Sequence, residues 1–124
     1  MKPKELTKAE EQIMQVLWKI GKGFIKDILE AVPEPRPAYT TLSTITRILE
    51  KKGFVGYNAY GKTHEYFPLI SEEEYKKFIT EKLVSNYFGN SFKSLVSFFV
   101  EEKNISLKEA DEIIRIIEEN KRQQ

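Results

Sequence analysis

The sequence has 124 residues, 40% of them hydrophobic and 31% charged, with a formal net charge of +1. This balance is typical of a soluble globular protein with a modest core; it excludes a disordered chain, and the absence of any run of about 18 apolar residues excludes a membrane-spanning one. Without cysteine there is no disulfide, thiolate metal site or cysteine nucleophile, and without the apolar core of a secretory signal we expect a cytoplasmic protein.

Two helices are expected before the first proline cluster. The segment "TKAE", Thr7 to Glu10, has the spacing of a capping box, and apolar residues recur after it at helical intervals, which predicts a helix over about residues 8–20. "GKG" at residues 21–23 breaks that helix, and "FIKDILEAV" has the apolar spacing of a short second one. "PEPRP" at residues 33–37 then ends it, because proline lacks an amide donor and biases the preceding residue away from helical geometry.

A third helix is predicted to begin near Ala38 or Tyr39 and to stop at Gly53. At about 100° per residue, its apolar side chains fall on one side, which we expect to face the core: Leu42, Ile45, Ile48 and Leu49. The opposite side carries short hydroxyl side chains and two cations: Thr40, Thr41, Ser43, Thr44, Arg47 and Lys51. A face exposed for solubility alone would favour Glu, Lys and Gln, because hydroxyl and β-branched residues have lower helix propensity by up to about 0.7 kcal/mol each.

Double-stranded DNA provides a physical reason for this polar face. Short hydroxyl side chains let a helix approach the major groove closely, Arg47 can bind a guanine edge or a phosphate, and Lys51 can reach the backbone. The alternative is that the hydroxyls only cap the helix start, which accounts for the first two threonines but not for the residues one and two turns later. The charge distribution agrees with DNA, since residues 1–70 carry 11 Lys and Arg against 8 Asp and Glu, and residues 71–124 carry 9 against 11.

A β-hairpin is predicted after the third helix. Two β-prone runs, residues 54–57 and 65–70, flank a polar segment with Gly61 at its tip. Helices followed by a hairpin in this order are typical of a winged helix-turn-helix.

The tip of this hairpin extends the predicted DNA surface. Lys62 and Thr63 are placed to contact phosphate. His64 is the only histidine, and no residue lies at the spacing that a metal site or a histidine relay requires. We therefore expect neither a metal nor any other cofactor.

Three amphipathic helices are predicted after residue 70. "SEEE" begins the first, which ends at "GN", residues 89–90; "SFKSLVSFFVEE" forms the second, and "SLKE" at residues 106–109 begins the third. Short helices this rich in Phe and Ile cannot cover one another's apolar faces, so we expect residues 1–70 to be a DNA-binding domain and residues 71–124 a dimerisation region. The expected dimer contacts are Phe78, Phe88, Phe92, Leu95, Val96, Phe99, Val100, Ile113 and Ile117.

The predicted fold class is therefore mainly α with a small β-hairpin wing, a winged helix-turn-helix followed by a helical dimerisation region. The alternative arrangement packs the C-terminal helices back on the N-terminal domain. The alternative function is a winged-helix protein-interaction module without sequence-specific DNA binding, which salt-insensitive binding would reveal. An enzyme is a distant third, because the sequence has no Gly-rich phosphate loop, metal cluster or carboxylate pair placed by its spacing in an apolar pocket.

Three segments resemble the BlaI and MecI family of penicillinase and methicillin-resistance repressors. They are "LTKAEEQIMQVLW", "TLSTITRILEKKGFV" and "SFKSLVSFFVEE", and the resemblance extends over roughly residues 6–119. Winged helices in general share the first two only loosely, so the third narrows the assignment to this family.

The resemblance implies a homodimeric transcriptional repressor that binds a palindromic operator. The two threonines of the family's recognition helix fall on Thr41 and Thr44, whereas Ser43 and Arg47 depart from the staphylococcal members and imply a different operator sequence. Family members are inactivated when a membrane sensor-protease signals a β-lactam and the repressor is cut between Asn and Phe. The matching bond here joins Phe98 and Phe99, without the Asn.

Overall fold

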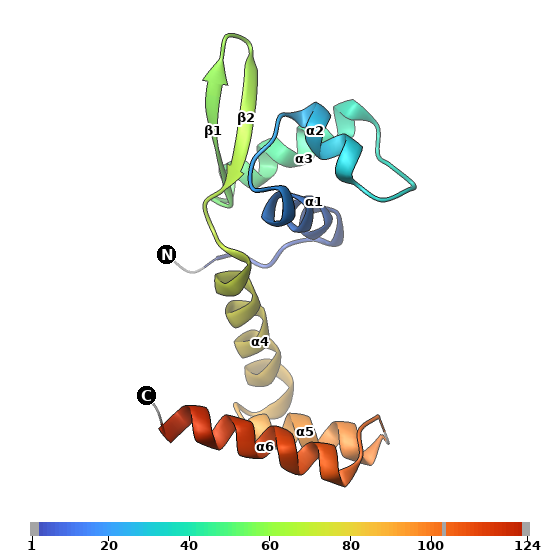
Figure 1. Cartoon of the computed structure of the whole chain (residues 1–124), viewed down its shortest axis with the longest axis vertical. Helices are drawn as coiled ribbons and strands as arrows, with labels where there is room; N and C mark the ends of the chain where they lie inside the picture. Colours follow the sequence, from blue (N-terminus) through green and yellow to red (C-terminus); the bar gives the residue numbers. More distant parts are fainter. Residues whose placement is uncertain (1–2, 103, 123–124) are drawn as a thin grey trace. The chain divides into compact units, whose positions relative to one another are not determined.

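The computed structural model describes residues 3–102 and 104–122. In chain order the elements are α1 (Lys8–Ile20), α2 (Ile25–Ala31), α3 (Tyr39–Lys51), β1 (Val55–Tyr60), β2 (Thr63–Pro68), α4 (Glu72–Phe88), α5 (Phe92–Glu101) and α6 (Leu107–Arg122) (Figure 1). This order confirms the predicted fold class of helices with an antiparallel hairpin. The chain divides into two compact units, residues 1–79 and residues 80–124. None of the helices in the described residues is both long and apolar enough to cross a membrane.

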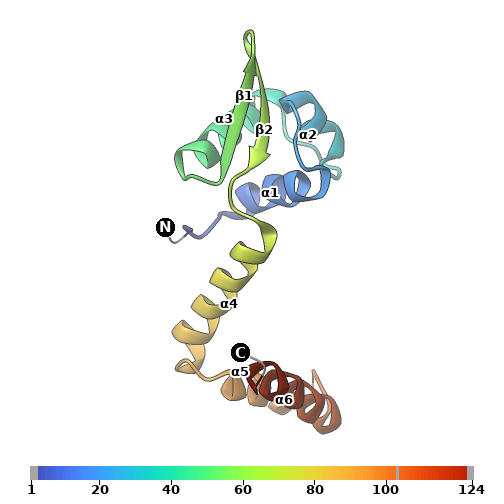
Figure 2. The ribbon, with the colours of Figure 1, turned by 60° about the vertical axis from the view of Figure 1, so that its left-hand side comes forward.

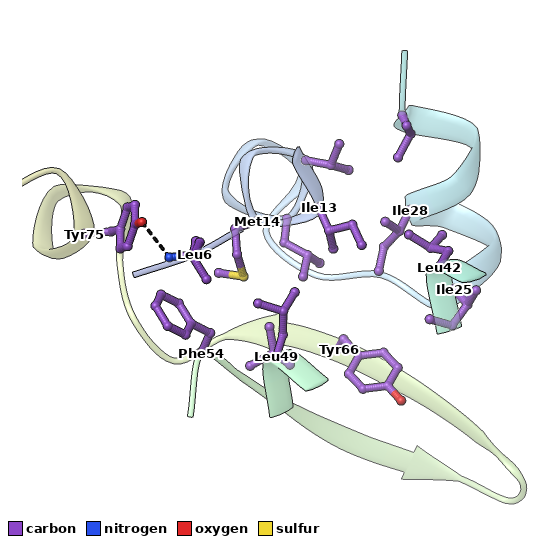
Figure 3. Close-up of a cluster of buried hydrophobic side chains, with 14 residues drawn as sticks. Leu6, Ile13, Met14, Ile25, Ile28, Leu42, Leu49, Phe54, Tyr66 and Tyr75 are labelled. Atoms are coloured by element: carbon purple, nitrogen blue, oxygen red, sulfur yellow. Dashed lines mark hydrogen bonds between the residues drawn. The ribbon is translucent and has the colours of Figure 1, made fainter. Parts of the chain in front are cut away.

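The core of the first unit lies between α1, α2, α3 and the hairpin, which extends past the helices (Figure 2). Its centre contains fully buried side chains from each helix, among them Met14, Ile28, Leu42 and Leu49 (Figure 3). Burying a side chain of this size contributes about 1.5–3 kcal/mol to folding. This packing fixes α3 by one face and leaves most of the opposite face exposed.

The start of α1 confirms the predicted capping box. The Glu10 amide donates to the Thr7 hydroxyl at 3.2 Å, and the Thr7 amide donates to the Glu10 carboxylate at 2.8 Å. The same carboxylate oxygen accepts a hydrogen bond from Lys52 Nζ at 2.7 Å. The ion pair therefore ties the end of α3 to the start of α1.

The buried face of α3 differs from the predicted one at two positions. Leu42 and Leu49 are fully buried, but Ile48 is 41% exposed, so its assignment to the inner face is wrong. Thr46 is buried instead, and its hydroxyl donates to the Leu42 carbonyl at 2.8 Å. Leu42, Thr46 and Leu49 share one narrow arc of the helix, and Ile48 lies outside it, one turn after Thr44.

The hairpin pairs regularly from Val55 opposite Pro68 to Tyr60 opposite Thr63. It therefore extends further toward its tip than predicted, whereas at its base the strands begin at Val55 instead of residue 54 and end at Pro68 instead of residue 70. Gly61 begins the two-residue turn with a φ of 64°, a conformation that primed hairpin turns require and that glycine adopts without steric cost. On its other edge, β2 pairs with a single residue of the loop before α2. The amides and carbonyls of Gly23 and Tyr66 exchange two hydrogen bonds, of 2.8 and 2.9 Å.

The first turns of α4 belong to the first unit. Tyr75 is buried, and its hydroxyl accepts a hydrogen bond from the Leu6 amide at 2.9 Å (Figure 3). Trp18 Nε1 donates to the Ile70 carbonyl at 2.9 Å just before the helix. Phe78 packs, partly buried, against the core of this unit, which is where the structure places this predicted dimer residue.

The second unit has a small core and many exposed apolar side chains. Val84, Val96 and Ala110 are buried, one from each helix. Leu83, the residue before Val84 on α4, is exposed. The exposed large apolar side chains of this unit are Leu83, Tyr87, Phe92, Phe98, Phe99, Leu107 and Ile116.

Candidate nucleic-acid interface

The predicted recognition face lies on the outside of α3. The side chains of Thr40, Thr41, Thr44, Arg47 and Lys51 are exposed, and that of Ser43 is partly buried. Because the apolar face of α3 is locked in the core, these side chains are held on a rigid element instead of a loop. A rigid element reduces the entropy lost when a polar side chain binds a partner.

Hydrogen bonds within α3 leave the recognition side chains capacity for a partner. The Thr44 hydroxyl donates to the Thr40 carbonyl at 3.0 Å and keeps its acceptor lone pairs available. Arg47 is 3.5 Å from the Ser43 hydroxyl, which is a weak hydrogen bond at an exposed position. Both side chains can exchange these contacts for polar groups of a partner.

A groove of about 670 Å³ separates α3 from the hairpin tip and the start of α2. Its walls bring together four of the predicted DNA-binding residues, namely Ser43, Arg47, Lys62 and Thr63. The other four, Thr40, Thr41, Thr44 and Lys51, lie on α3 outside this groove. The predicted surface thus has two parts, an outer ridge of α3 and a groove between α3 and the wing.

Sequence reasoning missed several residues that line this groove. Lys26 and Asp27 come from α2, Tyr39 begins α3, and Tyr66 comes from the middle of β2. Phe24, Ile25 and His64 complete the walls. The only sequence feature that indicates Lys26 is its place on the polar side of the short second helix. The position of Tyr66 depends on strand pairing, which no local pattern shows.

The Tyr66 phenol remains protonated in this environment. Burial raises its pKa, the Glu50 carboxylate raises the pKa further, and Arg47 opposes them. The phenol can therefore act as a hydrogen-bond donor at neutral pH.

His64 belongs to an aromatic cluster of the wing. Its ring stacks on Tyr57 with centroids 4.0 Å apart and meets Tyr66 edge-on at 6.1 Å. Across the described ranges, no group of three or more His, Cys, Asp or Glu residues is arranged to hold a metal ion. Stacking therefore accounts for the position of this histidine.

The predicted dimer residues, apart from Phe78, lie in the second unit. Val96 is buried; Phe88, Leu95, Val100, Ile113 and Ile117 are partly buried; and Phe92 and Phe99 are exposed. The Phe98 ring meets those of Phe88 and Phe99 at centroid distances of 5.7 and 5.9 Å. The bond between Phe98 and Phe99 lies inside α5, and the Phe98 carbonyl accepts a helical hydrogen bond from the Glu102 amide at 3.0 Å.

Comparisons with known proteins give consistent matches over most of the chain. The family described as penicillinase repressor matches residues 6–119. The methicillin resistance regulatory protein MecI of Mammaliicoccus sciuri is 27% identical over 114 residues, 91% of this chain and 93% of that protein. The penicillinase repressor of Bacillus licheniformis is 25% identical over 118 residues, 94% of this chain and 92% of that protein. The solution structure of the DNA-binding domain of the repressor BlaI superposes with a TM-score of 0.52 at 25% identity, covering 60% of this chain and 92% of that domain.

Proposed function

Because the chain belongs to the penicillinase repressor family, we propose that it acts in the cytoplasm as a homodimeric repressor that binds a palindromic DNA operator and is released from it by proteolysis. Family membership confirms the resemblance found in the sequence and makes the chain a DNA-binding transcriptional repressor, not an enzyme. The dimer, the symmetry of the operator and the proteolytic release are the parts of this function that we infer.

The observation that supports DNA recognition by the first unit is the exposed polar face of α3 beside a groove lined by cations. Thr41 and Thr44 can contact base edges or thymine methyl groups, and Arg47 can bind a guanine through two hydrogen bonds. The wing residues Lys62 and Thr63, at the tip of the hairpin, then contact the phosphate backbone. Ile48, exposed one turn after Thr44, adds an apolar group for a thymine methyl.

The second unit supports self-association. Its large apolar side chains, including Phe92, Phe99 and Ile116, remain exposed in a single chain, and a second copy would bury them. A dimer links two recognition helices and raises affinity for a two-fold operator through effective concentration.

Cleavage between Phe98 and Phe99 would break this link. The helical hydrogen bond across the site means that a protease reaches this bond only when α5 opens locally. The cut separates α6 from the rest of the unit and removes Phe99 and Val100 from the association surface. The partner that we propose for this step is a membrane sensor-protease pathway.

Substitution of Arg47 and of Thr44 by Ala tests the recognition helix. With labelled duplexes from the region upstream of the chain's own gene, each substitution should weaken binding by about 1–3 kcal/mol, while sedimentation shows an unchanged dimer. Lys19→Ala, which removes a cation from the last turn of α1, is the control and should bind as the parent does.

Unchanged affinity of the Arg47 and Thr44 variants for the upstream duplex would contradict the recognition surface. Binding of duplex DNA that does not fall with rising salt, together with salt-insensitive binding of a protein, would favour the interaction-module alternative.

A further inference from the structure

The groove between α3 and the wing contains polar residues with no role in the recognition proposed above, among them Tyr66 and Lys26. Tyr66 lies on the central part of β2, and Lys26 lies in the first turn of α2. Both line the same groove as Arg47 and Lys62. One ligand group in the groove could therefore contact Tyr66 and the three cations together.

Tyr66 is held more firmly than a side chain that serves only as groove wall. The residue is 5% exposed and its ring packs in the core, while its backbone is hydrogen-bonded to Gly23 on one side and paired with Tyr57 on the other. Figure 3 shows the hydroxyl directed away from the labelled core side chains. Phenylalanine would fill the core equally well, so core packing does not explain why this residue carries a hydroxyl.

The hydroxyl of Tyr66 is available to form a hydrogen bond. In the described part of the chain, no hydrogen bond joins this hydroxyl to another residue. Every buried side-chain nitrogen or oxygen atom there has a partner, so a hydroxyl without one is not fully buried. The Tyr66 hydroxyl therefore reaches the groove that this residue lines. A phenol held in one orientation loses little conformational entropy when it binds.

The charge of the groove selects an anion. Lys26, Arg47 and Lys62 line it, and the one carboxylate among its lining residues, that of Asp27, already accepts a hydrogen bond from the Phe24 amide at 2.9 Å. A protonated hydroxyl with surrounding cations is a donor set that suits a phosphate oxygen.

We propose that this groove binds one backbone phosphate of the operator, with the Tyr66 hydroxyl as a donor from its floor and Lys26 as a cation on its rim. The proposal deepens the proposed function and rests on it, because a DNA strand held by both α3 and the wing passes between them. The phosphate contact fixes the register of α3 on the duplex and is independent of base sequence.

The test uses the full chain and two labelled duplexes, the upstream duplex and a 30-base-pair duplex of arbitrary sequence. Tyr66→Phe should weaken binding to both by the same factor, about tenfold, and leave the dependence of log K on log salt unchanged, since a neutral donor releases no counterion. Lys26→Gln should also weaken both and reduce the salt slope by about one. Tyr57→Phe, on the opposing strand, and Lys19→Gln are the matched controls and should bind within twofold of the parent.

The proposal is overturned if Lys26→Gln and a folded Tyr66→Phe both bind the two duplexes within twofold of the parent. It is also overturned if the control variants lose as much affinity as Lys26→Gln and Tyr66→Phe. Lys26 is exposed, so its variant decides the question if Tyr66→Phe does not fold. Titration with inorganic phosphate tests whether the groove binds only the free ion. Saturable binding of phosphate at millimolar concentration, with no effect of the variants on duplex binding, also overturns the proposal. Equal parent affinity for both duplexes contradicts sequence-specific repression but leaves the effect of the variants measurable.

Discussion

Glu10 combines two roles at one carboxylate. It closes the capping box of α1 and pairs with Lys52 at 2.7 Å, and its side chain is 5% exposed. Burial raises its pKa, but the Lys52 ammonium and the hydrogen bonds from Lys52 and Thr7 lower the pKa by more, so the net change is downward. The charged form is therefore favoured by folding.

Glu10→Gln should lower the free energy of unfolding at neutral pH by about 1 kcal/mol, because Gln keeps the capping geometry but leaves Lys52 unpaired. A lowered folded-state pKa gives stability that is complete above the unfolded value of about 4.3 and is lost as pH falls through the folded value. Urea unfolding of parent and variant from pH 7 to pH 3 should show the difference shrinking below about pH 4.3. A constant difference over this range would show that the charge of Glu10 is not responsible.

At the residue scale, local patterns predicted what depends on neighbours in sequence and failed where tertiary packing decides. The capping box at Thr7 and the stop at Gly53 are local, and helices α1 to α5 end within two residues of the predicted positions. The helical spacing places Ile48 on the same broad apolar side as Leu42, whereas the arc that packs is narrower, is centred on Leu42 and Leu49, and buries Thr46 instead. A threonine can be buried there because its hydroxyl is satisfied by the helix backbone.

At the scale of elements, the packing of the first turns of α4 against the first unit could not be predicted from the sequence. The partner of Tyr75 is the amide of Leu6, 69 positions earlier, so no local spacing reveals the contact. The groove is similar, since the bridge between Gly23 and Tyr66 brings α2, α3 and the wing to one place. The exposed face of α3 was predictable because it lies on one helix.

Tyr75→Phe should destabilise the first unit, because it leaves the buried Leu6 amide without its acceptor. The expected loss is about 1–3 kcal/mol, measured by thermal or urea unfolding of the full chain. Tyr87→Phe is the matched control, since Tyr87 is 76% exposed in a single chain. Equal stability of Tyr75→Phe and the parent would mean that water replaces the phenol at this position.

At the scale of the whole molecule, each unit has a core of its own, and the core of the first unit is much larger than that of the second. The first unit buries side chains from α1, α2, α3, both strands and the first turns of α4. Among its described residues, the second buries only Val84, Val96 and Ala110 from the apolar side chains, while seven large apolar side chains stay exposed. A unit with so little core gains stability from a second copy, and we therefore expect folding of the second unit to depend on protein concentration.

A chain that ends at Phe98 reproduces the product of the proposed cleavage. It lacks α6 and the last residues of α5, so we expect a monomer by sedimentation velocity at micromolar concentration, with affinity for the two-fold operator reduced by about 10²–10⁴-fold. Its affinity for a single half-site should equal that of the parent's first unit, because α3 and the wing are intact. A chain ending at Glu119, within the last turn of α6, is the control and should remain a dimer. If the chain ending at Phe98 is still dimeric, or if the parent is itself a monomer, the C-terminal helices do not supply the dimer contact and the packed-back arrangement is favoured.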